Sequence, residues 1–105
     1  MLVDMDQQDR VAAFLDEHDL DAPLAYRLLD LQSEVGELAK EATGSTDYGA
    51  EPAAIDLAND EVGDALFALL SVAEAADVDA DAALEESLEK YERRIAETGD
   101  AGSGA

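Results

Sequence analysis

Apolar residues recur at helical spacing along most of the chain, and no segment alternates strictly between apolar and polar residues as a half-buried strand does. We therefore expect an all-α protein. Four helices are predicted, over roughly residues 6–17, from near Pro23 to about Thr43, from about Ala53 to Ala76 and from about Asp81 to Glu97.

Each predicted helix carries an apolar stripe that we expect to be buried. In the first helix the stripe is Val11, Phe14 and Leu15. In the second, a four-three spacing typical of a packed seam joins Leu24, Leu28, Leu31, Val35 and Leu38. The third stripe is Ala58, Val62, Ala65, Leu69, Val72 and Ala76, and the fourth is Leu84, Leu88, Tyr91 and Ile95. The pattern favours a helical bundle.

The length of 105 residues fits one domain, which we place at residues 1–97, followed by a disordered tail at 98–105. A domain this small buries a modest share of its surface. Sharing a helical core between copies remedies that shortage, so we expect the four-helix bundle to be completed by self-association.

The charge is extreme: 27 acidic residues against six basic ones give a formal net charge of −21. Such a chain would repel a nucleic-acid backbone, so we do not expect nucleic-acid binding. Because the apolar residues are abundant and regularly spaced, we interpret the charge as salt adaptation, typical of a halophile, and not as disorder.

The composition argues against thiol chemistry, secretion and a membrane-spanning helix. The chain has no cysteine, which excludes disulfides and thiolate chemistry. The N-terminal residues lack the features of a signal peptide, and the longest mostly apolar run, 65–76, is shorter than the roughly 20 residues that cross a membrane. We expect a soluble, cytoplasmic protein with no membrane partner.

Two matching phrases carry the candidate chemistry, EVGE at 34–37 and EVGD at 61–64. Each places two carboxylates three residues apart on one helix face, beside the apolar stripe, and Glu41 continues the first set. If the second and third helices pack antiparallel, these acidic flanks can face one another. Carboxylates gathered in this way favour Mg²⁺ or Mn²⁺ over Zn²⁺.

A plainer interpretation competes with a metal site, because acids three apart occur at several other places in this acidic chain. Spacing alone favours a solvated face. Gly36 and Gly63 shift the balance, since each costs about 0.5–1 kcal/mol relative to alanine inside a helix. A missing side chain lets a helix or a hydrated ion approach closely. The alternative function is a non-catalytic, self-associating helical module whose acids serve only salt tolerance.

The order of these motifs resembles that of the MazG-like nucleotide pyrophosphohydrolases, part of the all-α NTP pyrophosphatase superfamily. The shared signature is ExxE at 34–37, 23 intervening residues and ExxD at 61–64. The resemblance extends over about residues 24–94, and includes LxxEVGEL at 31–38 and EVGDALF at 61–67.

The resemblance implies a helical homodimer or homotetramer that hydrolyses nucleoside triphosphates, ribo or deoxyribo, to the monophosphate and pyrophosphate, as in nucleotide-pool housecleaning. It implies Mg²⁺, or Mn²⁺, held by Glu34, Glu37, Glu61 and Asp64. The metal would neutralise the triphosphate and activate a water. An acid whose oxygens are not occupied by the metal would take the proton of the water. This acid is Glu41 or one of the four proposed ligands, so the candidate catalytic residues are Glu34, Glu37, Glu41 and Glu61.

Half of the basic residues lie in the fourth helix, which makes Lys90, Arg93 and Arg94 candidates to bind the phosphates. The alternative is that they complement the helix dipole and pair with nearby acids. The family often has a lysine and an asparagine where this chain has Ser87 and Tyr91.

Other residues are further candidates for contacts with the substrate. Lys40 and Arg27 could also meet the phosphates. Tyr26, Phe67 and Tyr91 could stack on a nucleobase, although the helical positions of Phe67 and Tyr91 favour the core. Tyr48, in the loop between the second and third helices, is a candidate to cover a bound base.

Overall fold

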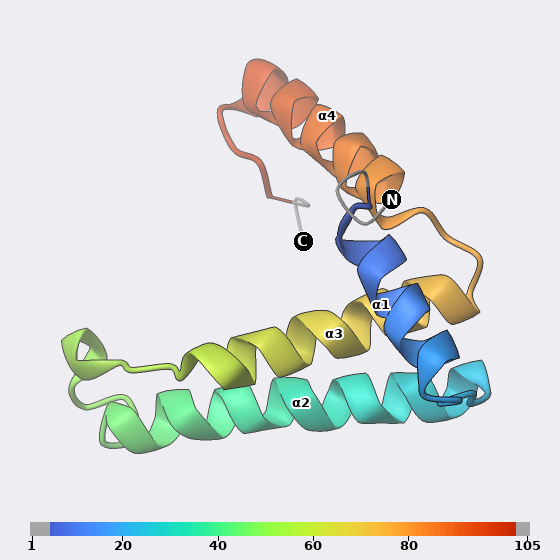
Figure 1. Cartoon of the computed structure of the whole chain (residues 1–105). Coiled ribbons are helices and arrows are strands. Elements are labelled where there is room, and N and C mark those ends of the chain that lie inside the picture. The colour runs from blue at the N-terminus through green and yellow to red at the C-terminus, as the bar shows by residue number, and fades with distance from the viewer. Residues whose placement is uncertain (1–4, 103–105) are drawn as a thin grey trace.

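The computed structural model describes residues 5–102, and within them the chain is helical with no strand. Its elements are α1 (Gln7–Glu17), α2 (Leu24–Ser45), the short 3₁₀ helix η2 (Pro52–Ala54), α3 (Asn59–Ala75) and α4 (Ala80–Thr98). Figure 1 shows α2 and α3 lying side by side, with α1 crossing them at one end and α4 beyond. The all-α prediction is confirmed.

Side-chain caps fix the ends of the outer helices. At α1, Asp9 N–H donates to Asp6 Oδ1 over 2.8 Å, and Asp6 N–H donates to Asp9 Oδ2 over 3.4 Å, which forms a capping box. At α4, Ala82 N–H donates to Asp79 Oδ1 over 3.1 Å. Gly99 ends α4 in the left-handed conformation, with φ of 78°, which glycine adopts without strain.

The third helix begins later than the predicted start near Ala53. Between η2 and α3 the chain is extended, and side chains of α2 bind its backbone. Glu41 Oε1 accepts a hydrogen bond from Ala58 N–H over 2.8 Å, and Ser45 Oγ accepts one from Asp56 N–H over 3.0 Å. These bonds satisfy N–H groups that the predicted extra helical turn would have used.

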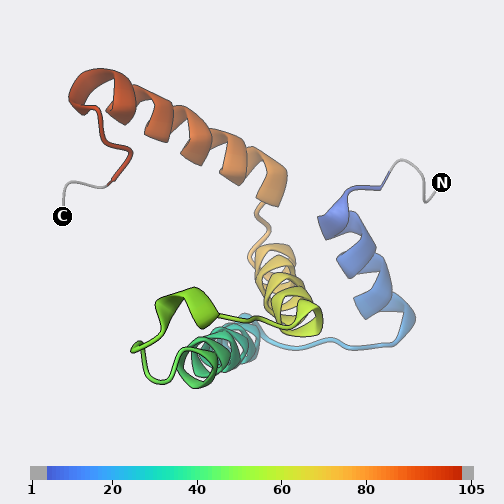
Figure 2. The same ribbon diagram turned by 90° about the vertical axis from the view of Figure 1, so that its left-hand side faces the viewer.

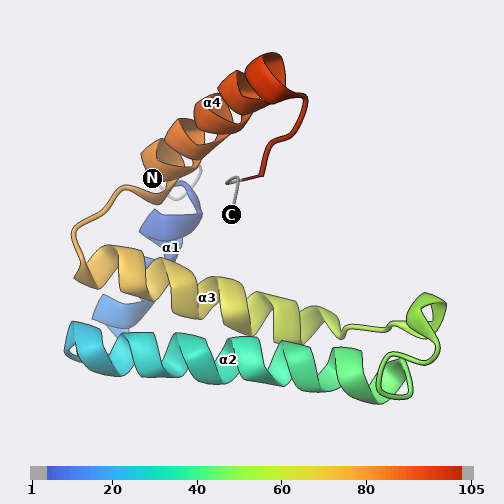
Figure 3. The same cartoon turned by 180° about the vertical axis from the view of Figure 1, so that it is seen from behind.

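The core of the chain lies on α3. Its buried apolar residues are Ala68, Leu70 and Ala73, which face α2 and α1, the helices that pack against α3. The ring of Phe14, on α1, meets Phe67 edge to face with centroids 5.8 Å apart. Seen from behind in Figure 3, α2 and α3 form an antiparallel hairpin.

The apolar stripe of α4 is exposed, which contradicts the predicted burial. Its side chains are 40–57% exposed at Leu84, Leu88, Tyr91 and Ile95. Among the described residues, substantial packing between helices is limited to α2 with α3 and α1 with α3. Figure 2 shows α4 leading away from the hairpin. The bundle is therefore not closed within one chain, because the connection after α3 directs α4 away from the other helices.

The predicted burial failed in part for the other helices too. On α1 and α3, Phe14, Val62 and Leu69 are 46%, 48% and 50% exposed, and the buried residues of α3 lie outside its predicted stripe. The same holds for α2. Leu24, Leu28 and Val35 are 38%, 47% and 52% exposed, while Leu31 and Leu38 are half-buried. Only one flank of α2 is covered, by α3. The remaining apolar surface needs a partner outside the chain, or stays in contact with water.

The start of α4 is tied to α1 by one side chain. Gln8 Nε2 donates to Glu74 Oε1 over 3.1 Å and to the carbonyl of Val78 over 2.8 Å. Its Oε1 accepts from Ala80 N–H over 2.7 Å. A single residue of α1 thus contacts the end of α3, the connection and the start of α4, which fixes the direction in which α4 leaves.

The predicted tail begins inside α4, because Thr98 is the last residue of that helix. Its hydroxyl bonds to the carbonyls of Arg94 and Asp100. Residues 103–105 lie outside the described residues, so the disorder predicted for 98–105 and the domain boundary at 97 stay predictions.

Candidate metal centre

Three of the four predicted metal ligands lie together between α2 and α3. Glu34 comes from the middle of α2, and Glu61 and Asp64 come from the first two turns of α3. Each offers one carboxylate oxygen, and these oxygens all lie within 4.8 Å of one another. We call these three residues the carboxylate cluster. The antiparallel hairpin brings the two acidic flanks face to face, because acids three residues apart share one side of a helix.

The two remaining predicted acids lie near the cluster but outside it. Glu37 is exposed on α2. Glu41 is half-buried, and its Oε1 accepts the bond from Ala58 at the start of α3, so one of its two oxygens has a structural role. Their assignment as a ligand and as a catalytic acid stays a prediction.

The surroundings of Glu61 disfavour its charged form. Desolvation raises the pKa of Glu61 above its ordinary value, and the negative charges of Glu41, Asp60, Glu37 and Asp64 raise it further. The negative charge around Glu61 is therefore unfavourable, and a divalent cation beside it would relieve the repulsion.

The donor set fits a hard cation. Mg²⁺ binds oxygen at about 2.0–2.1 Å, so two opposed ligands lie about 4.2 Å apart, and neighbouring ones lie closer. The oxygens of the carboxylate cluster, at up to 4.8 Å, need only small side-chain rotations to reach such positions. A set made of carboxylates alone favours Mg²⁺ or Mn²⁺ over metals that prefer nitrogen or sulfur.

A cavity of about 370 Å³ adjoins the cluster along the seam between α2 and α3. We call it the α2/α3 cavity. Glu34 and Asp64 line it together with four other polar or aromatic residues, Arg27, Asp30, Phe67 and Ser71. No sequence motif marks Asp30 or Ser71, although their helical spacing from Glu34 and Asp64 places them on the faces that meet in the hairpin.

The region that contains this cluster matches a known protein family. The family model described as the MazG nucleotide pyrophosphohydrolase domain matches residues 25–98, which is most of the chain and contains the whole carboxylate cluster. The chain belongs to this family. No curated protein and no solved structure matched it.

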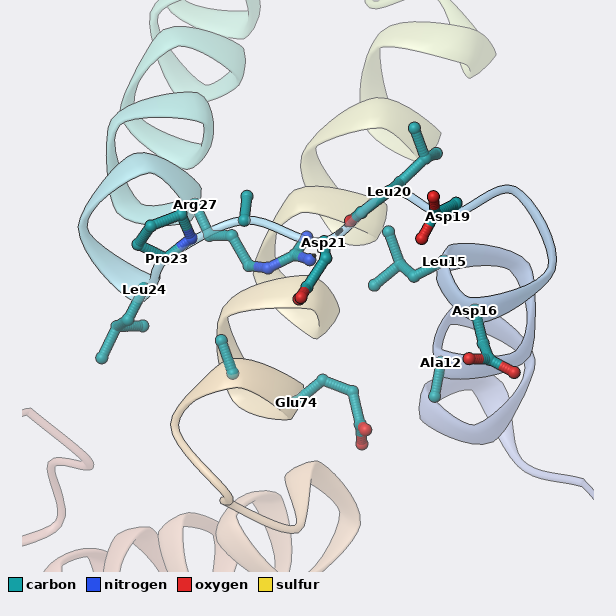
Figure 4. Close-up of a pocket in the computed structure, with 12 residues that line it drawn as sticks. Ala12, Leu15, Asp16, Asp19, Leu20, Asp21, Pro23, Leu24, Arg27 and Glu74 are labelled. Carbon is teal, nitrogen blue, oxygen red and sulfur yellow. Dashed lines mark hydrogen bonds between the residues drawn. The ribbon is translucent and has the colours of Figure 1, made fainter.

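A second, larger cavity lies partly outside the matched MazG region. It has a volume of about 580 Å³ and lies where the end of α1, the start of α2 and the end of α3 meet. Figure 4 shows acidic side chains around it, Asp16, Asp19, Asp21 and Glu74. None of the cluster residues lines it. Arg27 lines both cavities, and its Nη2 donates to the carbonyl of Leu20 over 2.8 Å.

The other residues predicted to bind substrate lie away from the cluster. Lys90, Arg93 and Arg94 belong to α4, and none of them lines the α2/α3 cavity. Tyr48 is 86% exposed in the loop after α2. Phe67, which was assigned to the core, is 37% exposed and lines the cavity. Within one chain, therefore, the three predicted cations of α4 do not line the cavity beside the predicted ligands, whereas Arg27, a further candidate, does.

The two glycines of the motifs face open space. A Cβ placed on Gly36 or Gly63 would meet nothing within 4 Å. The sequence suggested that glycine allows close approach of another helix. Among the described residues of one chain, no helix comes that close at either position.

None of the described helices is both long and apolar enough to cross a bilayer.

Proposed function

We propose that this MazG domain hydrolyses nucleoside triphosphates to the monophosphate and pyrophosphate, with Mg²⁺, or Mn²⁺, as its cofactor. The observation that supports this most directly is the carboxylate cluster, in which three acids from two helices lie within 4.8 Å inside the matched region. The family match indicates the reaction, and the cluster supplies ligands for the ion that such a reaction needs.

In this proposal Glu34, Glu61 and Asp64 hold the ion, and Glu37 adds negative charge beside it. When bound, a divalent ion neutralises charge on the triphosphate and lowers the pKa of a bound water. The oxygen of the water bonds to the α-phosphorus, the bond from that phosphorus to the bridging oxygen breaks, and pyrophosphate leaves. Glu41 Oε2 can accept the proton of the water, because the other oxygen of Glu41 already accepts the bond from Ala58.

The proposal includes a homodimer or homotetramer. The accessible surface is 7858 Å² for a chain of 11.1 kDa, against about 5,700 Å² for a compact monomer of this mass. The Cα radius of gyration is 16.8 Å, against about 13 Å for a compact domain of this length. The excess, about 2,200 Å² per chain, exceeds the roughly 800 Å² that each partner buries in a standard interface and lies in the range of large obligate interfaces. Lys90, Arg93 and Arg94 stay candidates for phosphate binding in such an assembly.

The test is pyrophosphate release from a panel of canonical and modified triphosphates, in high salt with Mg²⁺. The metal is worth several kcal/mol in the transition state, and about 1.4 kcal/mol is a factor of ten in rate. We therefore expect Glu61→Gln and Glu34→Gln each to lower kcat by on the order of 100-fold or more.

The matched control is Glu86→Gln, which removes one exposed carboxylate from α4 and should leave kcat within about twofold. Circular dichroism would check that the helices persist in every variant. Unchanged activity in both cluster variants would show that the site is wrong. No turnover with any triphosphate, together with no Mg²⁺ or Mn²⁺ binding by calorimetry, would rule out the enzyme.

A further inference from the structure

The α2/α3 cavity has two chemically different ends. Arg27 and Glu34 are seven residues apart on α2, and Asp64 and Ser71 are seven apart on α3. Seven residues are two turns, or about 10.5 Å along a helix axis. Because the helices are antiparallel, Glu34 and Asp64 share one end of the cavity, and Arg27 and Ser71 share the other.

The middle of the cavity suits a planar, uncharged group. Phe67 lines it with a partly exposed aromatic ring, and Ala68 beside it is small and buried. Asp30 also lines this stretch, and its negative charge disfavours a phosphate there. An aromatic ring beside a hydrogen-bonding side chain is the arrangement with which proteins hold nucleobases.

The far end offers both kinds of hydrogen-bonding group. Arg27 is half-buried, and one of its N–H groups is anchored on the carbonyl of Leu20, which leaves other N–H groups to donate. Ser71 is 3% exposed and its Oγ donates to the carbonyl of Phe67 over 2.8 Å, so toward the cavity its oxygen can only accept. Asp30, when ionised, also only accepts.

We propose that the α2/α3 cavity holds the nucleoside of the triphosphate, and that Arg27 and Asp30 select the base by its donor and acceptor groups. The inference rests on the proposed function, which places the phosphates at the carboxylate cluster. The base then extends from Glu34 toward Arg27, with its face on Phe67. The volume of about 370 Å³ lies within the usual range for small-molecule pockets.

The test compares four α,β-imido deoxynucleoside triphosphates, which carry different bases and are not cleaved, by calorimetry with Mg²⁺. Asp30→Asn replaces an acceptor with an amide that also donates. We expect it to change the relative affinities for the four bases by tenfold or more, since a site built to hydrogen-bond one edge rejects others strongly. Arg27→Gln should weaken binding of the preferred analogue at least tenfold. The affinity for Mg²⁺ alone should stay within twofold in both variants.

Steady-state kinetics with the cleavable triphosphates provide a second measurement. Arg27→Gln should raise KM at least tenfold and leave kcat within about threefold, because the residue contacts the base and not the reacting phosphorus. Arg27→Lys keeps the charge but loses the planar fork, and should recover only part of the affinity. Arg10→Gln is the matched control, since it removes an exposed arginine of α1 that does not line this cavity.

Two failures are distinguishable. If the wild-type protein cleaves triphosphates but Asp30→Asn and Arg27→Gln leave base preference and KM unchanged, the nucleoside lies elsewhere and only this inference is overturned. If the wild-type protein neither binds nor cleaves any triphosphate, the proposed function fails and the nucleoside cavity fails with it.

Discussion

The α2/α3 hairpin and α4 carry similar apolar stripes, yet the two regions use them differently. Among the described helices only α3, which packs against α2 and α1, has buried residues, Ala68, Leu70, Ser71 and Ala73, and even there Val62 and Leu69 of the predicted stripe are 48% and 50% exposed. No residue of α4 is buried. An amphipathic pattern thus predicts a helix and its apolar face, but the contact of that face depends on where the preceding connection directs the helix.

The difference extends to charge. The hairpin contains the carboxylate cluster and a cavity beside it, so three candidate metal ligands are assembled within one chain. Lys90, Arg93 and Arg94 lie on the helix that stands apart. Arg27 is the exception, because it is a cation within the hairpin itself, at the cavity. The hairpin therefore gathers three of the four predicted ligands, whereas α4 has an apolar face without a partner among the described residues.

The largest effect that we expect tests whether α4 meets a second copy. Leu88→Asp places a charge in the exposed stripe of α4. Burial of a leucine is worth about 1.5–3 kcal/mol and about 1.4 kcal/mol is tenfold in Kd, so a symmetric dimer should weaken by about 100-fold or more. Sedimentation velocity over a range of concentrations measures this. Helix content should persist, because Leu88 is not part of the buried core on α3.

The control for this substitution is Ala82→Asp, which adds the same charge to the opposite side of α4. It should associate as the wild-type protein does. Equal association of Leu88→Asp and the wild type would exclude the α4 stripe as an interface, and a monomeric wild type would exclude self-association altogether.

The sequence predicted most of the hairpin because its signals are local. The apolar spacing marked α2 and most of α3, and the repeated acidic phrase placed Glu34, Glu61 and Asp64 on helix flanks that the hairpin turns toward each other. The later start of α3 was missed, because the bond from Ala58 to Glu41 joins residues 17 positions apart and leaves no periodic trace.

The position of α4 and the α2/α3 cavity could not be predicted for a related reason. Gln8 fixes the direction of α4 through hydrogen bonds to residues 66 to 72 positions away. The cavity depends on which side chains of two helices meet. Arg27 was a candidate for contacts with the substrate, but Asp30 and Ser71 are ordinary residues in the sequence, and their significance comes only from lining the cavity beside the carboxylate cluster.

An intermediate effect separates the cluster from the general acidity of the chain. Monovalent salt should raise the melting temperature of every variant, because the screening length falls from about 10 Å at 0.1 M to about 3 Å at 1 M. At constant ionic strength, Mg²⁺ should add stability through the cluster, by about 2.7 kcal/mol when its concentration is 100 times Kd. Thermal unfolding followed by circular dichroism would show this.

The variant Asp64→Asn should lose the stabilisation by Mg²⁺ and keep the response to monovalent salt. An equal stabilisation by Mg²⁺ in this variant and in the wild type would mean that Mg²⁺ binds the diffuse acidic surface and not the cluster.

The smallest effect concerns the junction where α1 meets α4. The negative charge of Asp6 raises the pKa of Asp81 above its ordinary value of 3.8, and desolvation and Asp79 raise it further. The folded protein therefore binds this proton more tightly than the unfolded chain does, so the contribution of Asp81 to stability is highest below pH 3.8 and falls as the pH rises through the raised pKa. Asp81→Asn removes the negative charge that Asp6 and Asp79 repel. It should raise the melting temperature slightly at pH 7 and leave it unchanged at pH 3, whereas Glu86→Gln, which removes a charge from α4 away from Asp6, should show no such pH-dependent gain. Equal differences between Asp81→Asn and the wild type at both pH values would mean that repulsion between Asp81 and Asp6 does not lower the stability of this junction.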